Sequence, residues 1–191
     1  MNLFPIEKLK QKNVLAISGA KGTGKTTLAS ALKYNDSNRA LVAFADPLKK
    51  MLSKYYNIPN YILHDPDMKE SPFVMPDGTQ TTYRQLMQSF GTDLGRGINK
   101  GVWTTLALID IIHTPADLVI VHDLRMLNEY EELLKWTNVR TIRIHRDTDN
   151  DDHHVTENEL FSIPYDFVLD NSSDIISMVN KAEDFIKEEF V

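Results

Sequence analysis

The 191-residue sequence contains no cysteine, only two tryptophans, and eight residues each of glycine and proline. Without cysteine the chain has no disulfide framework, no thiolate metal site and no cysteine nucleophile, which fits a reducing compartment. No repeat or low-complexity tract is present, and 42% hydrophobic with 25% charged residues is an ordinary globular composition. The composition therefore argues against a disordered chain.

The sequence also lacks an excess of positive charge and any long apolar run. Its formal net charge is −6, so we expect no broad nucleic-acid-binding surface. The most apolar segment, residues 102–112, contains Asp110 and is too short for the roughly 20 residues that span a bilayer. The apolar run before the glycine-rich stretch at residue 19 is near the lower length limit of a secretory signal. We therefore expect no membrane association and a cytoplasmic location.

Short apolar runs alternate with segments of helical periodicity along the chain. The runs are predicted to be buried strands, at residues 14–18, 41–45, 118–122, 140–145 and 167–169. The segments with the apolar spacing of helices are residues 26–33, 47–56, 83–94, 102–112, 126–136 and 175–190. Strands that alternate with helices predict a parallel α/β sheet with right-handed crossovers.

A chain of this length is expected to form a single domain. Two polar segments interrupt the alternation, namely residues 57–82, which contain four prolines, and residues 147–156, which are rich in Asp and His. Long loops in a compact domain are often binding or lid elements. We therefore predict one domain with two mobile inserts.

The stretch GAKGTGKT at residues 19–26 fits the pattern G-x-x-x-x-G-K-[ST] at every position. It follows an apolar run and precedes a helical segment, as a phosphate-binding loop requires. Glycines let consecutive N–H groups turn into one concavity, and the start of the next helix adds its dipole. The predicted ATP-binding residues are Gly19, Ala20, Lys21, Gly22, Thr23, Gly24, Lys25, Thr26 and Thr27.

Individual roles follow from the chemistry of this loop. Lys25 is predicted to reach the β- and γ-phosphates and to take part in catalysis, and the Thr26 hydroxyl is predicted to ligate Mg²⁺. Lys21 is expected to be solvated, and Thr27 to pack or to cap the helix. The alternative is a glycine-rich turn that binds nothing, which is disfavoured because both the motif and its context are present.

A second signal is the sequence VIVHDLR, which places Asp123 and Arg125 at the end of a predicted buried strand. A carboxylate at the carboxyl end of such a strand lies beside the phosphate loop, so Asp123 is a candidate Mg²⁺ ligand, directly or through water. Arg125 is a candidate to bind a transferring or accepting phosphate. In the alternative interpretation Asp123 caps the following helix and Arg125 pairs with Glu129.

Three further arginines are candidates for phosphate binding, because one guanidinium group can bind two phosphate oxygens at once. Arg146 ends the fourth predicted strand, and a closing lid would bring it onto the γ-phosphate. The alternative for Arg146 is a surface ion pair with Asp147 or Asp149. Arg84 and Arg96 flank a predicted helix, and simple surface exposure is the alternative for both.

The stretches GAKGTGKTT, FADPLK, LMQSFGTDLGR, VHDLRMLNE and DDHHVTE together resemble phage-type deoxynucleoside monophosphate kinases. The resemblance extends from about residue 14 to residue 169. It implies a P-loop nucleoside-triphosphate-hydrolase-like three-layer α/β fold with a five-stranded parallel sheet. It further implies an acceptor-binding insert at about 47–100 and a lid at about 146–160.

The same resemblance implies an activity and a set of site residues. The enzyme would move the γ-phosphate of ATP, with Mg²⁺, onto a deoxynucleoside monophosphate such as dGMP, dTMP or a modified dCMP. Besides the loop on the ATP phosphates, the implied acceptor-site residues are Asp46, Lys49, Arg84, Arg96, Asp123, Arg125 and Glu157. Asp152 and His154 are implied within or beside the lid. The chain is short for the family, which leaves lid length and a homodimer open.

The chemistry of the reaction supports this interpretation and keeps two alternatives. A nucleoside monophosphate attacks through an oxygen that is ionised near neutral pH, since its second pKa is about 6, so no general base is needed. A hydroxyl acceptor would need a base, which Asp46 could supply unless it only caps the helix that begins at Pro47. The alternatives are therefore a P-loop kinase of another small metabolite and a non-kinase P-loop ATPase or switch.

Other conspicuous residues are interpreted structurally. The His and Asp cluster at residues 145–154 is not predicted to bind zinc, because adjacent residues rarely converge on a tetrahedral site. Trp103 and Trp136 are predicted to anchor the core. Phe73 and Tyr83 are the aromatic residues that we favour for stacking on a base.

Overall fold

The computed structural model describes residues 10–146, 160–172 and 174–190. The chain divides into two compact units. The first unit is Met1–Ala43 with Leu108–Val191, and the second unit is Phe44–Ala107. The second unit thus contains the segment 47–100, to which the sequence resemblance assigns acceptor binding.

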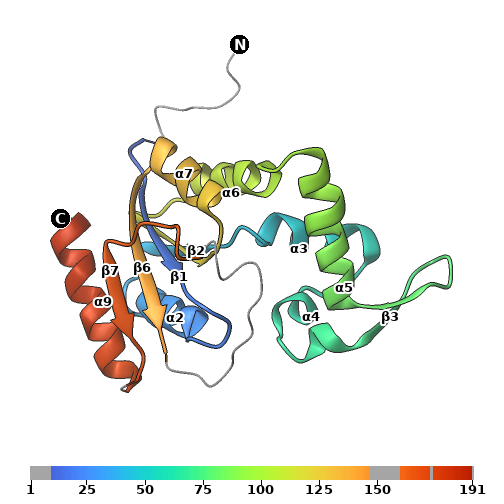
Figure 1. The fold of residues 1–191 in the computed structure, drawn as a ribbon, viewed down its shortest axis with the longest axis horizontal. Helices are drawn as coiled ribbons and strands as arrows, with labels where there is room; N and C mark the ends of the chain where they lie inside the picture. Colours follow the sequence, from blue (N-terminus) through green and yellow to red (C-terminus); the bar gives the residue numbers. More distant parts are fainter. Residues whose placement is uncertain (1–9, 147–159, 173, 191) are drawn as a thin grey trace, which may run out of the picture. The chain divides into compact units, whose positions relative to one another are not determined.

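The first unit is built on a five-stranded sheet in the order β2-β5-β1-β6-β7 (Figure 1). Its strands are β1 (Asn13–Ser18), β2 (Arg39–Val42), β5 (Leu118–Leu124), β6 (Asn138–His145) and β7 (Phe167–Asp170). Every pair of neighbouring strands runs parallel. The helices of this unit are α2 (Lys25–Asn35), α7 (Leu127–Trp136), α9 (Ile175–Phe190) and the part of α6 (Val102–His113) from Leu108 onward.

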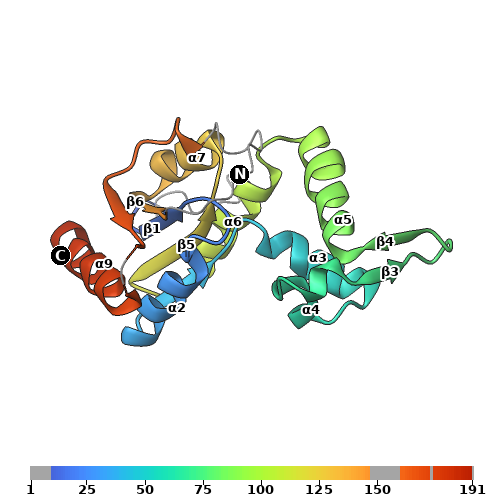
Figure 2. The same ribbon diagram turned by 60° about the horizontal axis from the view of Figure 1, so that its bottom comes forward.

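Helices cover both faces of this sheet, which is why its central strands are apolar on both sides. Helices α2 and α9 pack against one face, and α7 lies on the other (Figure 2). The core between the sheet and the first pair of helices includes Leu15, Ile17, Leu28, Leu32, Ile120, Ile142, Ala182 and Ile186. The predicted parallel α/β fold with five strands is confirmed.

The predicted second strand was misplaced at its end. Strand β2 ends at Val42, where its pairing with β5 stops, although the prediction extended it to residue 45. Ala43 and Phe44 are buried without being part of a strand. In the sequence, burial without pairing has the same apolar signature as a buried strand.

The second unit is smaller and mainly helical. Its elements are α3 (Asp46–Tyr56), α4 (Asn60–His64), the 3₁₀ helix η1 (Met68–Glu70), β3 (Pro72–Val74), β4 (Gln80–Thr82), α5 (Tyr83–Gln88), the π-helix η2 (Ser89–Arg96) and the start of α6. Strands β3 and β4 form an antiparallel hairpin (Figure 2). The segment predicted to be a polar loop, residues 57–82, therefore contains short helices and this hairpin.

The core of the second unit forms around Trp103, which is 9% exposed and packs with Leu48, Leu52, Leu63 and Leu86. The predicted helix 83–94 changes to a π-helix after Gln88. Glycine at position 95 lets Trp103 pack against this segment, because a Cβ there would lie 2.5 Å from the Trp103 ring. Trp103 Nε1 also donates to the Gly91 carbonyl at 2.7 Å.

The predictions for the other aromatic residues have mixed outcomes. Trp136 is not a core anchor: it is half-buried on α7, where its Nε1 donates to Glu132 at 2.8 Å and Lys135 lies over its ring. Phe73 and Tyr83 pack on each other with ring centroids 5.1 Å apart, and their stacking on a base stays a prediction. In the described ranges, each helix is too short or too polar to cross a membrane.

Candidate active site

The loop between β1 and α2 has the backbone geometry that its glycines allow. Gly19 has φ of 148°, and a Cβ there would lie 2.5 Å from the Ile144 carbonyl oxygen, so the loop approaches β6 too closely for a side chain. Gly24, directly before α2, is left-handed with φ of 97°. Such conformations are readily accessible only to glycine. The motif thus forms a tight turn at the start of a helix.

Lys25 curls back over this loop. Its ammonium donates to the carbonyl oxygens of Gly19 at 2.8 Å and Ala20 at 2.6 Å, and the residue is 9% exposed. Thr23 is also buried and donates from Oγ1 to Ala20 at 3.0 Å. Because an ammonium has three donors, Lys25 can hold these carbonyls and still donate to a phosphate oxygen.

The environment of Lys25 disfavours its positive charge. Its pKa falls from the ordinary value of 10.5 to about 8, first because burial removes water and second because Arg125 is positive. Asp123 opposes this effect and raises the pKa. The three charges therefore lie within electrostatic reach of one another, and a bound anion would favour the protonated lysine.

The register of the sheet places charged residues on both sides of the loop. Ser18, the last residue of β1, pairs with Leu124 of β5 on one side and with Arg143 of β6 on the other. The carboxyl ends of parallel strands meet at one edge of a sheet, where α/β proteins bind ligands. Asp123 and Arg125 consequently flank the phosphate loop on one side, and Arg143 and Arg146 flank it on the other.

Glu129, rather than Asp123, satisfies the start of α7. The Glu129 carboxylate is buried and accepts the backbone N–H groups of Arg125 at 3.0 Å and Met126 at 3.1 Å. The residue directly before the helix is Met126. The alternative in which Asp123 caps this helix is therefore wrong, and Asp123 lies at the end of β5 without that role.

The oxygen donors of the site fit Mg²⁺. Thr26 is exposed on the first turn of α2, and Asp123 is half-buried at the end of β5. Hydroxyl and carboxylate oxygens suit this cation, which keeps several waters and binds substrate phosphates. In the part of the chain that the structure describes, no three His, Asp or Glu residues gather as a metal cluster. The residues thus fit a metal shared with a nucleotide rather than one enclosed by protein ligands.

Arg143 is a residue of this edge that the sequence analysis did not single out. Its guanidinium carbon lies 4.5 Å from the ring centroid of Phe161 and 5.6 Å from that of Tyr165. The Tyr165 hydroxyl lies 2.7 Å from the Leu160 carbonyl and 3.1 Å from Ser18 Oγ, and burial raises the pKa of Tyr165. The only signal in the sequence was a cation near the end of a strand.

Arg143 and Arg146 line a small pocket beside the phosphate loop. Its volume is about 50 Å³, and its lining residues are Ala20, Thr23, Arg143, Ile144, His145, Arg146, Leu160 and Phe161. Arg146 is exposed. The pocket therefore lies between two residues of the loop, Ala20 and Thr23, and two arginines, Arg143 on β6 and Arg146 directly after this strand.

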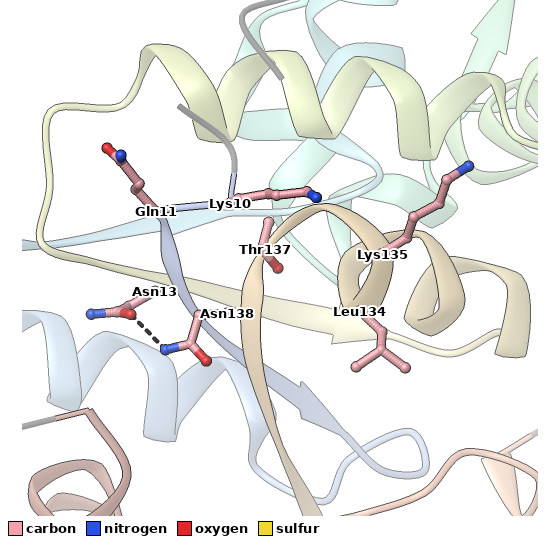
Figure 3. Close-up of a pocket in the computed structure, with 7 residues that line it drawn as sticks. All are labelled: Lys10, Gln11, Asn13, Leu134, Lys135, Thr137 and Asn138. Carbon is pink, nitrogen blue, oxygen red and sulfur yellow. Dashed lines mark hydrogen bonds between the residues drawn. The ribbon is translucent and has the colours of Figure 1, made fainter. Parts of the chain in front are cut away.

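A larger pocket lies at the amino ends of β1 and β6, opposite to the strand ends that flank the phosphate loop (Figure 3). Its volume is about 690 Å³, and it is lined by Lys10, Gln11, Asn13, Leu134, Lys135, Thr137 and Asn138. Asn13 and Asn138, the first residues of β1 and β6, are joined there by a hydrogen bond of 2.8 Å. Because ligands of parallel sheets bind at the carboxyl ends of the strands, this pocket is not the candidate active site.

The predicted acceptor residues of the second unit are engaged in contacts within that unit. Lys49 is only 8% exposed, and its ammonium lies 3.3 Å from His64 Nδ1 and 3.7 Å from Asp46 Oδ1. Lys49 is therefore not a solvated surface lysine. Arg84 forms an ion pair with Glu70, and Arg96 is half-buried at the end of η2.

The structure does not bear on every predicted site residue. Glu157, Asp152 and His154 belong to the segment 147–159, which lies outside the described residues. The loop residues with Lys25, Asp123, Arg125 and Arg146 come together in the first unit. Asp46 and Lys49 come together in the second unit.

Comparisons with known proteins concern both the family and the fold. The family model described as deoxynucleotide monophosphate kinase matches residues 61–182, which is more than half of the chain and includes Asp123 and Arg125. The match begins after the phosphate loop. The comparison with curated proteins gives no match.

Solved structures of kinases resemble the chain at low sequence identity. Shikimate kinase from Aquifex aeolicus has a TM-score of 0.51 at 12% identity, covering 92% of this chain and 96% of that one. The APS kinase CysC of Mycobacterium tuberculosis has a TM-score of 0.49 at 11% identity, covering 93% and 99%. A gluconokinase from Sinorhizobium meliloti has a TM-score of 0.48 at 9% identity, covering 95% of this chain and 95% of that one. The likeness to shikimate kinase concerns the fold alone.

Proposed function

As the chain belongs to the deoxynucleotide monophosphate kinase family, we propose that residues 19–26 bind the phosphates of ATP and that the second unit binds the acceptor nucleotide. The chain is an ATP-dependent kinase that phosphorylates a deoxynucleoside monophosphate. Both substrates are anions, so the enzyme has to align them and offset their repulsion.

The observation that carries the proposed ATP site is the buried Lys25 ammonium over the loop carbonyls. Lys25 would bind the β- and γ-phosphates as the loop amides and the start of α2 surround them. Ala20, Lys21, Gly22, Thr23 and Thr27 complete the proposed loop contacts. The lowered pKa of Lys25 supports this role, since a phosphate would replace the water that burial removes.

Catalysis is proposed to consist of charge neutralisation at the transferring phosphate. Arg125 would bind it from the side of β5 and Arg146 from the side of β6, because guanidinium groups stabilise the charge that spreads over the phosphate oxygens. Thr26 and Asp123 would hold Mg²⁺, with Asp123 binding directly or through water. When bound, this ion would offset the negative charge of the phosphate oxygens.

Asp46, Lys49, Arg84 and Arg96 are proposed to bind the acceptor, together with Asp123 and Arg125 at its phosphate and Glu157 beside the lid. Lys49 and Arg84 are cations already held near anionic or neutral partners. An acceptor phosphate could exchange with those partners. Asp46 would orient Lys49 or contact the sugar, since an ionised phosphate acceptor requires no general base.

We propose dGMP, dTMP or a modified dCMP as the acceptor, with free nucleotides and not nucleic acid as partners. The net charge of −6 supports the second point. Because ATP and deoxynucleotides are cytoplasmic metabolites, the proposed place of action is the cytoplasm. A homodimer is the proposed assembly to test first by light scattering.

A coupled assay of ADP release tests the proposed function. The purified chain is given ATP with Mg²⁺ and each deoxynucleoside and ribonucleoside monophosphate in turn, and the products are identified as diphosphates. We expect turnover with at least one of dGMP, dTMP and modified dCMP, and its loss in Arg125→Ala. Arg140→Ala, which removes a surface arginine paired with Glu189, is the matched control. Hydrolysis of ATP without an acceptor would instead indicate a P-loop ATPase.

A further inference from the structure

We propose that Asn171, in the connection between β7 and α9, is a positioning residue that fixes one peptide group of the phosphate loop for ATP binding. The proposal rests on the proposed role of residues 19–26. Asn171 lies 148 residues along the chain from Thr23 of that loop, and nothing in the loop motif indicates it. Its contacts assign the role.

Asn171 joins the phosphate loop to the end of β6. Its side-chain Nδ2 donates to the Thr23 carbonyl oxygen at 2.9 Å. Its backbone N–H donates to the His145 carbonyl at 2.8 Å. The residue is half-buried. The side-chain amide is therefore held by its own backbone at a fixed place beside the loop.

This hydrogen bond sets the orientation of the peptide group between Thr23 and Gly24. In a trans peptide the carbonyl of one residue and the N–H of the next point in opposite directions. Because the Thr23 carbonyl points to Asn171, the Gly24 N–H points away from Asn171. We assign that N–H to the phosphate-binding side of the loop.

The Thr23–Gly24 peptide needs such an external contact. Glycine accepts both signs of φ at little cost, so the φ of 97° at Gly24 is not enforced by its own sterics. A peptide group that precedes a glycine can rotate when nothing holds its carbonyl. Asn171 supplies a donor that a rotated peptide would lose.

The packing around Gly24 acts in the same direction. A Cβ on Gly24 would lie 2.8 Å from Asn171 Nδ2, so the side-chain amide fills the space behind this glycine. Asp170 supports the arrangement, since its carboxylate accepts the Ser172 N–H at 2.9 Å and the Ser172 hydroxyl at 2.8 Å. The turn that carries Asn171 is therefore fixed before any ligand arrives.

The test compares Asn171→Ala and Asn171→Asp with wild type. Each protein is assayed for the KM of ATP, the KM of the acceptor that wild type uses fastest among dGMP and dTMP, and thermal stability. In parallel, the chemical-shift change of the Gly24 amide on addition of ATP with Mg²⁺ is measured by NMR. Asn35→Ala is the matched control, because Asn35 donates an equivalent amide hydrogen bond to Glu183 on the surface of the same unit.

We expect Asn171→Ala to raise the KM of ATP about 10-fold, the effect of one hydrogen bond, with the KM of the acceptor unchanged. The Gly24 shift change should shrink. Asn171→Asp should be worse, because its carboxylate would face the Thr23 carbonyl oxygen and repel it. Asn35→Ala should match wild type in each of these measurements.

An unchanged KM of ATP and an unchanged Gly24 response in both Asn171 variants would overturn the proposal. A loss of thermal stability with those two values preserved would show a purely structural role and would also overturn it. Failure of the proposed function is distinguishable, since wild-type turnover in Lys25→Ala would remove the loop itself from ATP binding.

Discussion

The two units of this chain hold their buried ammonium groups in different ways. In the first unit Lys25 donates to the neutral carbonyls of Gly19 and Ala20. In the second unit Lys49 lies against the His64 ring and near the Asp46 carboxylate. A phosphate that arrives at Lys25 adds to existing hydrogen bonds, whereas one that arrives at Lys49 has to compete with a carboxylate. The difference predicts separate effects of mutation on the two substrates.

The largest expected effect comes from Lys25→Ala. Removing the ammonium that we propose to bind the β- and γ-phosphates should lower kcat/KM about 1,000-fold, measured by ADP release, with far-UV circular dichroism unchanged. Lys33→Ala is the matched control, because Lys33 donates to the Ser37 carbonyl at 2.9 Å from the exposed end of the same helix. Equal losses of kcat/KM in the two variants would show that Lys25 has no specific role in the reaction.

The pH dependence of ATP binding sharpens the comparison. Free Lys25 loses its proton above about pH 8, and bound phosphate favours the charged form, so binding above that pH should take up a proton. The affinity should fall by up to about 10-fold for each further pH unit. Calorimetry in two buffers of different ionisation enthalpy measures the uptake. Lys25→Arg, which stays charged, should remove the dependence, and a flat profile in wild type would contradict it.

The same pKa shift has a consequence for the ligand-free fold. The unfolded chain, with Lys25 near 10.5, binds more protons than the folded chain between about pH 8 and 10.5. This group therefore makes the ligand-free fold more stable as the pH rises through that window.

Lys49→Met should affect the acceptor and not ATP. Loss of the buried cation of the second unit should raise the KM of the acceptor about 10-fold, a typical value for one charged hydrogen bond, and leave the KM of ATP unchanged. Lys54→Ala, an exposed lysine on the same helix, should change neither value. A rise in the KM of ATP alone would exclude Lys49 from the acceptor site.

The smallest effect on activity is expected from Gly95→Ala in η2. Its new methyl would lie 2.5 Å from the Trp103 ring, and such overpacking costs about 1–3 kcal/mol. Urea unfolding followed by Trp fluorescence measures this change in stability. Gly97→Ala is the control, since nothing lies within 4 Å of its Cβ. Equal stability of the two variants would show that the π-helix tolerates a side chain against Trp103.

The sequence allowed the phosphate loop to be predicted because its chemistry depends on neighbouring residues. Bare backbone, a lysine and a helix start have to follow one another within a few positions, so residues 19–26 form a readable pattern. Asp123 and Arg125 were predictable for a related reason, since the ends of parallel strands share one edge. The five strands were found through their buried, apolar character.

Residues brought to the loop from distant parts of the chain could not be predicted in this way. Arg143 and Asn171 are near the loop because β6 and β7 end at the same edge, and neither belongs to a local motif. The burial of Lys49 depends on His64, which lies on α4, a helix too short to have a periodicity. The hairpin of β3 and β4 has three-residue strands and was missed for the same reason.

The buried Glu129 holds the backbone of Arg125 in place while the Arg125 side chain stays exposed. Its carboxylate is compensated by two main-chain N–H groups, while Arg125 itself is exposed to solvent. The guanidinium can therefore swing toward a substrate and back without stranding a buried anion. Movement at so small a desolvation cost would suit the role proposed for Arg125, because a phosphate-binding residue has to release its product in every catalytic cycle.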